Sequence, residues 1–404
     1  MLKTELAELL RNGENSGVEF KRDDILPERL AREVSGLANL LGGRILLGVE
    51  DDGTVSGLAR GRQRAEEWSM QVVRDHIQPP LIPYWEVIEW EPGVLIGIVS
   101  IPEAAPDKPY KAKLGNHFQT FVRVGTLTRE ATREEEGRLY QAAGILRYDI
   151  KPVPGSRVSD LDQGRLDDYF GRVLGRAMPG SNEQRETILV NTDIAIVDRE
   201  FKPPTVGGMV LFGTSPNRFL KQAGISATSY PGVDKSYAAN DLEEIQGPLV
   251  SLFDPAGRIV ERGTIDRAMA FVERNMGRSS RLVEGVRRDT PDYPIEAVRE
   301  TIVNAVVHRD YTIALVNIEL GMYSDRLEVV SPGRLPNTVT IAKMKEGYRA
   351  SRNELLKDIL RDYGYVESRG MGVRTKIIAG MIAHTGREPE LIEREDAFAV
   401  RLLR

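Results

Sequence analysis

The feature that most constrains the fold is the change of hydrophobic period within the first third of the chain. Between residue 12 and about residue 145, short runs alternate apolar and polar side chains, as in GVEFK and HFQTFVRVG. Alternation with period two is typical of strands that bury one face. The segment ERLAREVSGLANLL has instead the spacing of an amphipathic helix. We therefore expect strands and helices to alternate in a first domain, residues 1–150.

The rest of the chain suggests two further domains. The Pro/Gly-bearing segment KPVPGSRVSD predicts a linker, and a middle domain follows that mixes helices with one apolar strand, GGMVLFG. The polar stretch GRSSRLVEGVRRDTPDYP predicts a second connector. After it come the helix IEAVRETIVNAVVHR, the strands ALVNIELGMY and RLEVVS, and a helix behind Gly372. At roughly 150 residues per domain, these patterns predict an α+β protein with a middle domain, 151–276, and a C-terminal domain, 277–404.

Composition excludes several classes of protein. With no cysteine and four histidines, the chain has no disulfide and no thiolate metal site. No run is long enough to cross a bilayer, and MLKTELAELL reads as a short amphipathic helix without a signal-peptide core. We therefore expect a cytoplasmic protein with no membrane partner.

A net charge of −5 means that nucleic acid would have to bind at a local basic patch. Each candidate patch, taken alone, is more typical of a solvated surface. The candidates are Arg60, Arg62 and Arg64, then Lys108, Lys111 and Lys113, then Arg278, Arg281, Arg287 and Arg288.

Three carboxylates near the N-terminus could converge. Glu14 and Glu19 are five residues apart around the first predicted strand, and Asp51 follows a strand in the predicted hairpin GGRILLGVEDDGTVSGL. Alternation places Glu19 and Lys21 on one face, which we expect to be the solvent side. If the two strands are neighbours, Asp51 can meet Glu19 across the sheet.

Three such carboxylates would suit Mg²⁺ or Mn²⁺, which polarise a phosphodiester and activate water. Lys21 could hold a phosphate as a point charge. The alternative is that Asp51-Asp52-Gly53 is an ordinary turn and that the glutamates are surface residues. Spacing alone favours this alternative.

Three ordered motifs resemble the Schlafen AlbA-type domain: ENSGVEFKRDD, LANLLGGRILLGVEDDGTVSGL and FVRVGTLTREAT. In animal Schlafens, two glutamates and an aspartate form the metal-binding triad of an RNA-cleaving site. The resemblance implies this catalytic and metal-binding role for Glu14, Glu19 and Asp51, with Lys21 beside them. Many bacterial relatives are instead described as DNA-binding proteins or transcription regulators. The resemblance thus implies a nucleic-acid partner, RNA or DNA, and leaves cleavage open.

A second constellation lies near the C-terminus. Glu300 and Asn304 are four residues apart on a predicted helix and therefore share one face. Gly370 and Gly372 directly precede a helical pattern, where backbone N–H groups can approach a phosphate. This arrangement could hold a Mg²⁺–triphosphate group. The alternative is a polar surface pair beside ordinary turns.

RETIVNAVVHRDY, DRLEVVSPGRLP, SRNELL and GMGV, in that order, resemble the divergent GHKL-type ATPase domain, an α/β sandwich. The resemblance implies ATP binding, with Glu300 as general base, Asn304 on Mg²⁺, and Gly370 and Gly372 over the phosphates. Ser331-Pro332-Gly333 replaces the family's adenine-binding Asp-x-Gly-x-Gly box, so Ser331 and Gly333 would lie on the base side. GHKL relatives often dimerise, so we expect a homo-oligomer. No Walker A motif is present.

The sequence as a whole predicts an ATP-responsive protein that acts on nucleic acid, as a Schlafen-like metal-dependent nuclease with slow ATPase activity. The alternative is a non-catalytic DNA-binding transcription regulator that senses ATP. A third alternative is a scaffold in which both sites are degenerate. A role in anti-phage defence is an analogy with the family.

Overall fold

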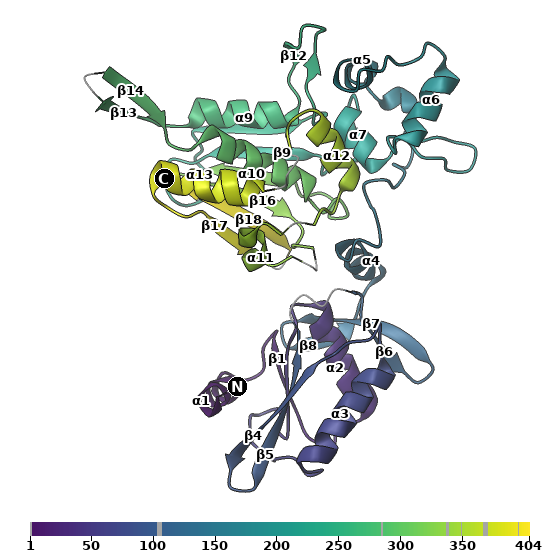
Figure 1. The fold of residues 1–404 in the computed structure, drawn as a ribbon, viewed down its shortest axis with the longest axis vertical. Coiled ribbons are helices and arrows are strands. Elements are labelled where there is room, and N and C mark those ends of the chain that lie inside the picture. The colour runs from purple at the N-terminus through teal and green to yellow at the C-terminus, as the bar shows by residue number, and fades with distance from the viewer. Residues whose placement is uncertain are drawn as a thin grey trace. The chain divides into compact units, whose positions relative to one another are not determined.

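The computed structural model describes residues 2–102, 107–283, 286–336, 339–348, 350–366, 371–394 and 396–404, without the side chains of residues 278–289. The chain divides into two compact units, residues 1–146 and residues 147–404 (Figure 1). Helices and mixed sheets occur in both units, so the predicted α+β class is confirmed. Among the helices of the described residues, none is long and apolar enough to span a membrane.

The N-terminal unit contains two four-stranded sheets, of order β1-β2-β5-β4 and β3-β6-β7-β8. In the first sheet β1 is parallel to β2, whereas β2, β5 and β4 are antiparallel. The strands are β1 (Val18–Lys21), β2 (Gly43–Leu47), β3 (Ile77–Gln78), β4 (Tyr84–Glu91), β5 (Val94–Ile101), β6 (Lys111–Leu114), β7 (His117–Val124) and β8 (Leu127–Glu130). The helices are α1 (Lys3–Asn12), α2 (Pro27–Asn39), α3 (Arg62–His76) and α4 (Arg133–Ala142).

Helix α2 joins the two sheets of this unit. Its apolar side chains, including Leu30, Val34 and Leu37, are fully buried in a core shared with β2, β5 and β7. At its C-terminal end the buried Asn39 donates from Nδ2 to the carbonyls of Tyr110 and Phe121, both at 2.8 Å, and accepts from the Tyr110 N–H. The amide thus satisfies backbone groups that would otherwise be buried without a partner.

The predicted hairpin around Asp52 forms only in part. A turn is present, because the Gly53 N–H donates to the Glu50 carbonyl at 2.9 Å and Gly53 has a φ of +86°. The second arm is a single bridge between Val49 and Val55, and β2 pairs with β1 and β5. The turn was therefore predictable, but the strand partner is chosen by packing across the whole sheet.

The C-terminal unit is built on one six-stranded sheet of order β10-β9-β15-β16-β18-β17. Its strands are β9 (Gly224–Ser229), β10 (Asp241–Gln246), β15 (Ile318–Met322), β16 (Arg326–Pro332), β17 (Glu390–Glu393) and β18 (Ala397–Leu403). Helices α9 (Thr264–Asn275), α10 (Ile295–Val307) and α13 (Ala379–Thr385) pack on one face of the sheet, which gives a two-layer sandwich (Figure 1).

The remaining elements of this unit are short. The helices are η1 (Val158–Asp160), α5 (Gln163–Asp168), η2 (Tyr169–Val173), α6 (Asn182–Asn191), α7 (Val206–Phe212), α8 (Pro216–Phe219), α11 (Ile341–Glu346), α12 (Glu354–Asp362) and η3 (Val373–Ile378). The strands are the hairpins β11 (Leu252–Phe253) with β12 (Ile259–Glu261), and β13 (Arg278–Val283) with β14 (Val286–Pro291). The predicted second connector thus contains a hairpin.

The predicted middle segment shares its sheet with the C-terminal segment. β9 pairs in parallel with β15, and a single hydrophobic core runs from Val153 to Leu402. Val153, within the predicted linker, is 1 % exposed, and the boundary between compact units lies after Leu146. Pairing between distant segments removes the independence that the linker-like composition suggested.

The predicted strand GGMVLFG is helix α7, and every residue of it is buried. Thr205 caps the helix, because its Oγ1 accepts a hydrogen bond from the Gly208 N–H at 3.0 Å. The strand prediction was wrong because a short, wholly apolar run has no period that separates a strand from a buried helix.

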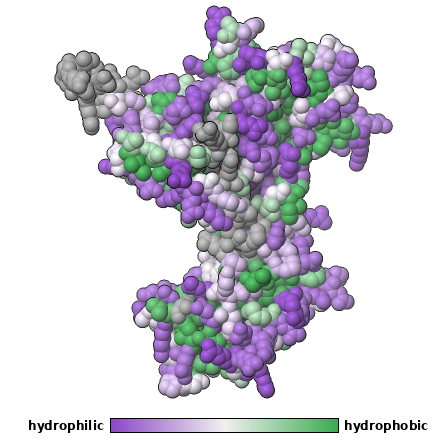
Figure 2. All heavy atoms as spheres, in the orientation of Figure 1, coloured by the Kyte–Doolittle hydropathy of each residue, from purple (hydrophilic) through white to green (hydrophobic). Residues whose placement is uncertain are grey.

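Figure 2 shows hydrophilic residues over much of the visible face of each unit, with smaller hydrophobic groups between them. Among the described residues, one cluster of buried apolar side chains lies in the C-terminal unit and two lie in the N-terminal unit. Each unit therefore carries its own core, and each candidate site belongs to one unit.

Candidate functional site

The structure brings together the three predicted carboxylates of the N-terminal unit. Glu14, Glu19 and Asp51, here called the acidic cluster, surround the side chain of Lys21. The Lys21 ammonium lies 2.6 Å from Glu19 Oε1, 3.7 Å from Glu14 Oε1 and 3.6 Å from Asp51 Oδ1. Because β1 and β2 are parallel neighbours, the chain that leaves β2 carries Asp51 to the end of β1.

Glu19 does not lie on the solvent side as predicted. The residue is 4 % exposed, because Arg123 of β7 covers it and places Nη1 2.6 Å from Glu19 Oε2. Asp51, by contrast, has a side chain that is 85 % exposed. The cluster therefore has a buried carboxylate with a fixed position and an open, exposed side.

Arg123 holds the segment that carries the cluster. Its side chain is fully buried, and Nη2 donates to the carbonyls of Asn15 at 2.7 Å and Val18 at 3.1 Å. A fourth carboxylate, Glu33 of α2, lies 3.5 Å from Arg123 Nη1. Neither residue was predicted to belong to the site, although Arg123 is part of the FVRVG motif.

The charges and the burial of the site shift the pKa values of Lys21 and Glu33. Burial lowers the pKa of Lys21, but the hydrogen bond and charge of Glu19, followed by the charges of Glu14 and Asp51, raise that pKa above its ordinary value. Burial is also the main reason that the pKa of Glu33 is raised, against the hydrogen bond from Thr128. Lys21 therefore stays an ammonium ion at neutral pH.

The cluster fits a hard cation by its chemistry, since its donors are carboxylate oxygens around one point. In the arrangement of the described residues, however, no group of three or more His, Asp or Glu side chains is placed to hold a metal ion. The Lys21 ammonium stands where the cation would be. Glu14 Oε1 also accepts from the Phe20 N–H at 2.9 Å. A divalent cation would need the ammonium to leave.

Several residues of the predicted basic patches have internal partners. Arg60 pairs with the buried Asp23 at 2.9 Å and lies over the Trp68 ring. Lys108 is buried and donates to the Leu40 carbonyl. The side chains of Arg278, Arg281, Arg287 and Arg288 lie outside the described residues.

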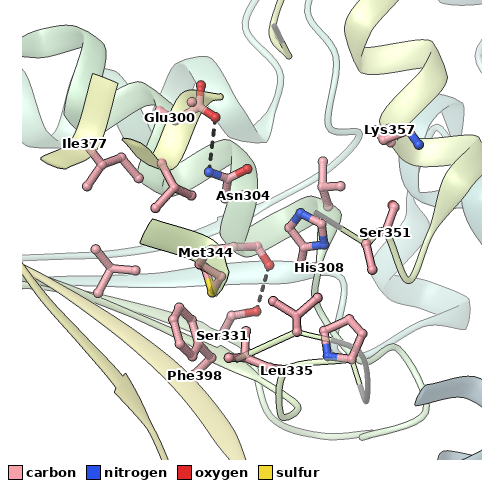
Figure 3. Close-up of a pocket in the computed structure, with 18 of the residues that line it drawn as sticks. Glu300, Asn304, His308, Ser331, Leu335, Met344, Ser351, Lys357, Ile377 and Phe398 are labelled. Atoms are coloured by element: carbon pink, nitrogen blue, oxygen red, sulfur yellow. Dashed lines mark hydrogen bonds between the residues drawn. The ribbon is translucent and has the colours of Figure 1, made fainter. Parts of the chain in front are cut away.

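The C-terminal unit has a cavity of about 430 Å³ between α10, η3, the segment 333–361 and strands β16, β17 and β18. Five of the predicted ATP-site residues line it: Glu300, Asn304, Ser331, Gly333 and Gly372. Gly370 lies outside the described residues. Figure 3 shows Glu300 and Asn304 on α10 and His308 directly after it, with Ser331 and Phe398 on the strands opposite.

The carboxylate and the amide of α10 contact each other directly. Asn304 Nδ2 donates to Glu300 Oε1 at 3.1 Å, and Lys376 of η3 approaches Glu300 Oε2 at 3.9 Å. Glu300 is 6 % exposed, so its charge lies at the cavity wall with little access to solvent. The α10 side chains therefore occupy the relative positions that the sequence predicted.

The segment Ser331-Pro332-Gly333, which we predicted to lie on the base side of a nucleotide, is tightly packed. Ser331 Oγ donates to the Ala305 carbonyl at 2.7 Å, so this hydroxyl is already engaged with α10. Gly333 has a φ of +107°, and a Cβ there would come within 2.4 Å of Arg352 Nη1. Gly333 is thus required by both its backbone conformation and its neighbours.

His308, one turn beyond Asn304, also lines the cavity and was not assigned a role by our sequence analysis. Burial, and then the charges of Arg352 and Lys357, lower the pKa of His308 to about 4. The ring is therefore neutral at neutral pH. The cavity is also lined by four cationic side chains: Arg334, Lys357, Arg361 and Arg374.

The cavity suits a nucleotide by its composition. Its lining includes an apolar wall of Val329, Phe398 and Val400, which can contact a flat base. The cationic side chains of the lining can bind phosphates. Ser331 adds a neutral hydroxyl to the lining.

Comparisons with known proteins agree with this architecture. Residues 14–132 match the sequence model of the Schlafen AlbA_2 family. Residues 316–402 match the model described as putative ATP-dependent DNA helicase RecG C-terminal. The chain thus joins a Schlafen AlbA_2 domain to an ATPase-like domain, as predicted. This pair of domains indicates an ATP-dependent function that is related to nucleic acid. Glu300 and Asn304 precede the second matched span.

The solved structures that are similar to the chain include the following two. The DIP2311 protein from Corynebacterium diphtheriae has 20% identity and a TM-score of 0.46, with 99% of this chain and 79% of that chain covered. The other is the N-terminal domain of a putative ATP-dependent DNA helicase RecG-related protein from Nitrosomonas europaea. It has 23% identity and a TM-score of 0.26, with 33% of this chain and 93% of that domain covered. No curated protein matched the sequence.

Proposed function

We propose that this protein binds nucleic acid at the acidic cluster and hydrolyses phosphodiester bonds there, under the control of a nucleotide in the C-terminal cavity. The observation that carries the proposal is the convergence of Glu14, Glu19 and Asp51 on one cation position. These residues lie within the span that matches the Schlafen AlbA_2 family.

Each residue has a distinct part in this proposal. Glu14, Glu19 and Asp51 would hold Mg²⁺ or Mn²⁺, which when bound polarises the phosphodiester and activates water. Arg123 fixes Glu19 from behind, so the carboxylate presents only Oε1 to the open side. Lys21 would orient a phosphate oxygen as a point charge.

The test of cleavage uses the full chain with RNA and with DNA, in Mn²⁺ and in EDTA. Glu19→Gln keeps the shape of the side chain and removes one anionic ligand, so cleavage is expected to fall at least a hundredfold while nucleic-acid binding survives, on the order of an effect at a catalytic group. Glu66→Gln, on the exposed face of α3, is the matched control. Absence of cleavage by the unaltered protein would reject the nuclease.

A non-catalytic regulator is the second candidate, and one observation favours it. Lys21 already neutralises part of the acidic cluster, so the site is complete without a metal ion. In that case Glu19→Gln would leave DNA binding unchanged, and neither Mn²⁺ nor EDTA would alter it.

For the C-terminal cavity we propose binding of ATP. Asn304 would ligate the Mg²⁺ that accompanies the triphosphate, and Glu300 would accept a proton from the attacking water. The bound nucleotide would then change nucleic-acid affinity by about 5- to 150-fold, the usual range of coupling between two sites. Binding curves with and without a non-hydrolysable ATP analogue, at fixed salt, measure this coupling. Identical curves would reject it.

A homo-oligomeric state, a cytoplasmic location and a role in transcription regulation or defence stay predictions. Sedimentation of the purified chain with and without nucleotide tests the first of them.

A further inference from the structure

We propose that Lys21 is a built-in counter-ion, which keeps a divalent cation out of the acidic cluster until a phosphate of the nucleic acid draws the ammonium away. The inference rests on the proposed function in that it takes the cluster as the site of the cation. It adds that the nucleic acid moves Lys21 before the cation binds. Metal and nucleic acid would therefore bind together more tightly than either binds alone.

Lys21 and a metal ion exclude each other from the acidic cluster. The ammonium lies 2.6 Å from Glu19 Oε1 and within 3.7 Å of an oxygen of Glu14 and of Asp51. A divalent cation needs the same oxygens at about 2.0–2.6 Å. Two cations cannot share this point, since both the oxygens and the space are taken and like charges repel.

Lys21 can leave the acidic cluster, whereas Arg123 cannot. The Lys21 side chain is 22% exposed, and its one backbone hydrogen bond goes to the Phe20 carbonyl at 2.7 Å. The Arg123 side chain is fully buried and bound to Asn15, Val18, Glu19 and Thr128. A flexible lysine at the open side is the group that can exchange.

A phosphate of the nucleic acid can replace the contacts that the Lys21 ammonium gives up. A phosphate that approaches the open side of the cluster is repelled by the carboxylates, because both are negatively charged. The ammonium is the cation nearest to the cluster's exposed member, Asp51, and can turn to the phosphate. The vacated carboxylates would then attract a divalent cation. Because binding equilibria are linked, the metal must raise nucleic-acid affinity by the same factor.

The experiment measures Mn²⁺ binding to the full chain by calorimetry, independently of cleavage. Lys21→Gln removes the competing charge, so Mn²⁺ is expected to bind on the order of tenfold more tightly or better than to the unaltered chain. Lys111→Gln is the matched control, because Lys111 pairs with Glu136 at 2.8 Å outside the cluster. The control is expected to leave Mn²⁺ affinity unchanged.

Two further measurements locate the effect. Adding Glu19→Gln to Lys21→Gln is expected to abolish the gain, which places the ion at the cluster. Adding a short oligonucleotide, DNA or RNA, at fixed salt is expected to raise Mn²⁺ affinity of the unaltered chain and to have little effect on Lys21→Gln. Lys21→Met serves as a second variant of similar length, and tryptophan fluorescence checks that each variant is folded.

Equal Mn²⁺ affinity of the unaltered chain and of folded Lys21→Gln and Lys21→Met would overturn the inference. An oligonucleotide effect that persists in Lys21→Gln would also overturn it. A chain that cuts neither RNA nor DNA, but gains Mn²⁺ affinity on loss of Lys21, would reject the nuclease and support the counter-ion. The two proposals therefore fail separately.

Discussion

Gly372 lies so close to the carboxylate of Glu300 that a Cβ added to it would fall 1.8 Å from Glu300 Oε1. Such a distance is far inside van der Waals contact, so a side chain at position 372 must displace Glu300 or the start of η3. The glycine is thereby tied to the carboxylate of α10 and to the cavity that both residues line.

Gly372→Ala is therefore expected to weaken binding of MgATP at least tenfold, on the order of the loss from a misplaced site group. Calorimetry with a non-hydrolysable analogue measures the affinity. Gly380→Ala is the control, since a Cβ there would meet only Pro294 Cγ at 3.9 Å. Equal losses in both variants would mean that the effect is not specific to Glu300.

The two polar side chains of α10 are expected to separate binding from hydrolysis. Asn304→Ala should weaken nucleotide binding in Mg²⁺, because the amide that would ligate the ion is lost. Glu300→Gln should keep the affinity within about threefold and lower the rate of hydrolysis by about 10²–10⁴-fold. Titrations with Mg²⁺ and phosphate-release assays check both. An Asn304→Ala variant with unaltered affinity would contradict the assigned role.

Arg123→Met is expected to destabilise the N-terminal unit by about 3–5 kcal/mol, because it leaves Glu19 and Glu33 with buried charge and no guanidinium. All three tryptophans of the chain (Trp68, Trp85 and Trp90) lie in this unit. Urea denaturation followed by tryptophan fluorescence therefore reports on it alone.

The control for this prediction is Arg129→Met, which removes an ion pair with Glu135 near the surface. Such an exposed pair contributes little to stability, because solvent screens the two charges. A cost for Arg123→Met as small as that of the control would show that the buried guanidinium does not hold the site together.

His308 should make the C-terminal unit sensitive to mild acid. Its pKa is lowered from 6.5 to about 4 by burial, so the unfolded chain binds more protons than the folded chain between these pH values. The free energy of unfolding should therefore fall as the pH drops from 6.5 to about 4, by at most about 3 kcal/mol. The His308 ring has some access to solvent through the cavity, so we expect a loss of unfolding free energy below this upper limit.

His308→Gln should flatten this dependence, whereas His117→Gln, on the exposed end of β7, should not. Denaturation followed by circular dichroism at several pH values compares the three proteins. A dependence that survives in His308→Gln would assign the acid sensitivity to other groups.

Local patterns of the sequence predicted much of each site. Alternation along β1 put Glu19 and Lys21 on one face, and helical spacing put Glu300 beside Asn304; both relationships are present in the structure. They follow from the periods of strand and helix, which depend only on residues a few positions apart. The strand GGMVLFG failed because a run with no polar residue has no such period.

What the sequence alone determined is the type of those elements that have a clear hydrophobic period, the two domain types and which side chains share a face. Tertiary structure alone decided that Arg123, more than a hundred residues from Glu19, covers it, and that Lys21 takes the point where the carboxylates meet. It also decided that β9 joins β15, which merges two segments into one unit. These outcomes depend on contacts between distant residues, whose selection rests on burial and charge across the whole fold and leaves no local period to read.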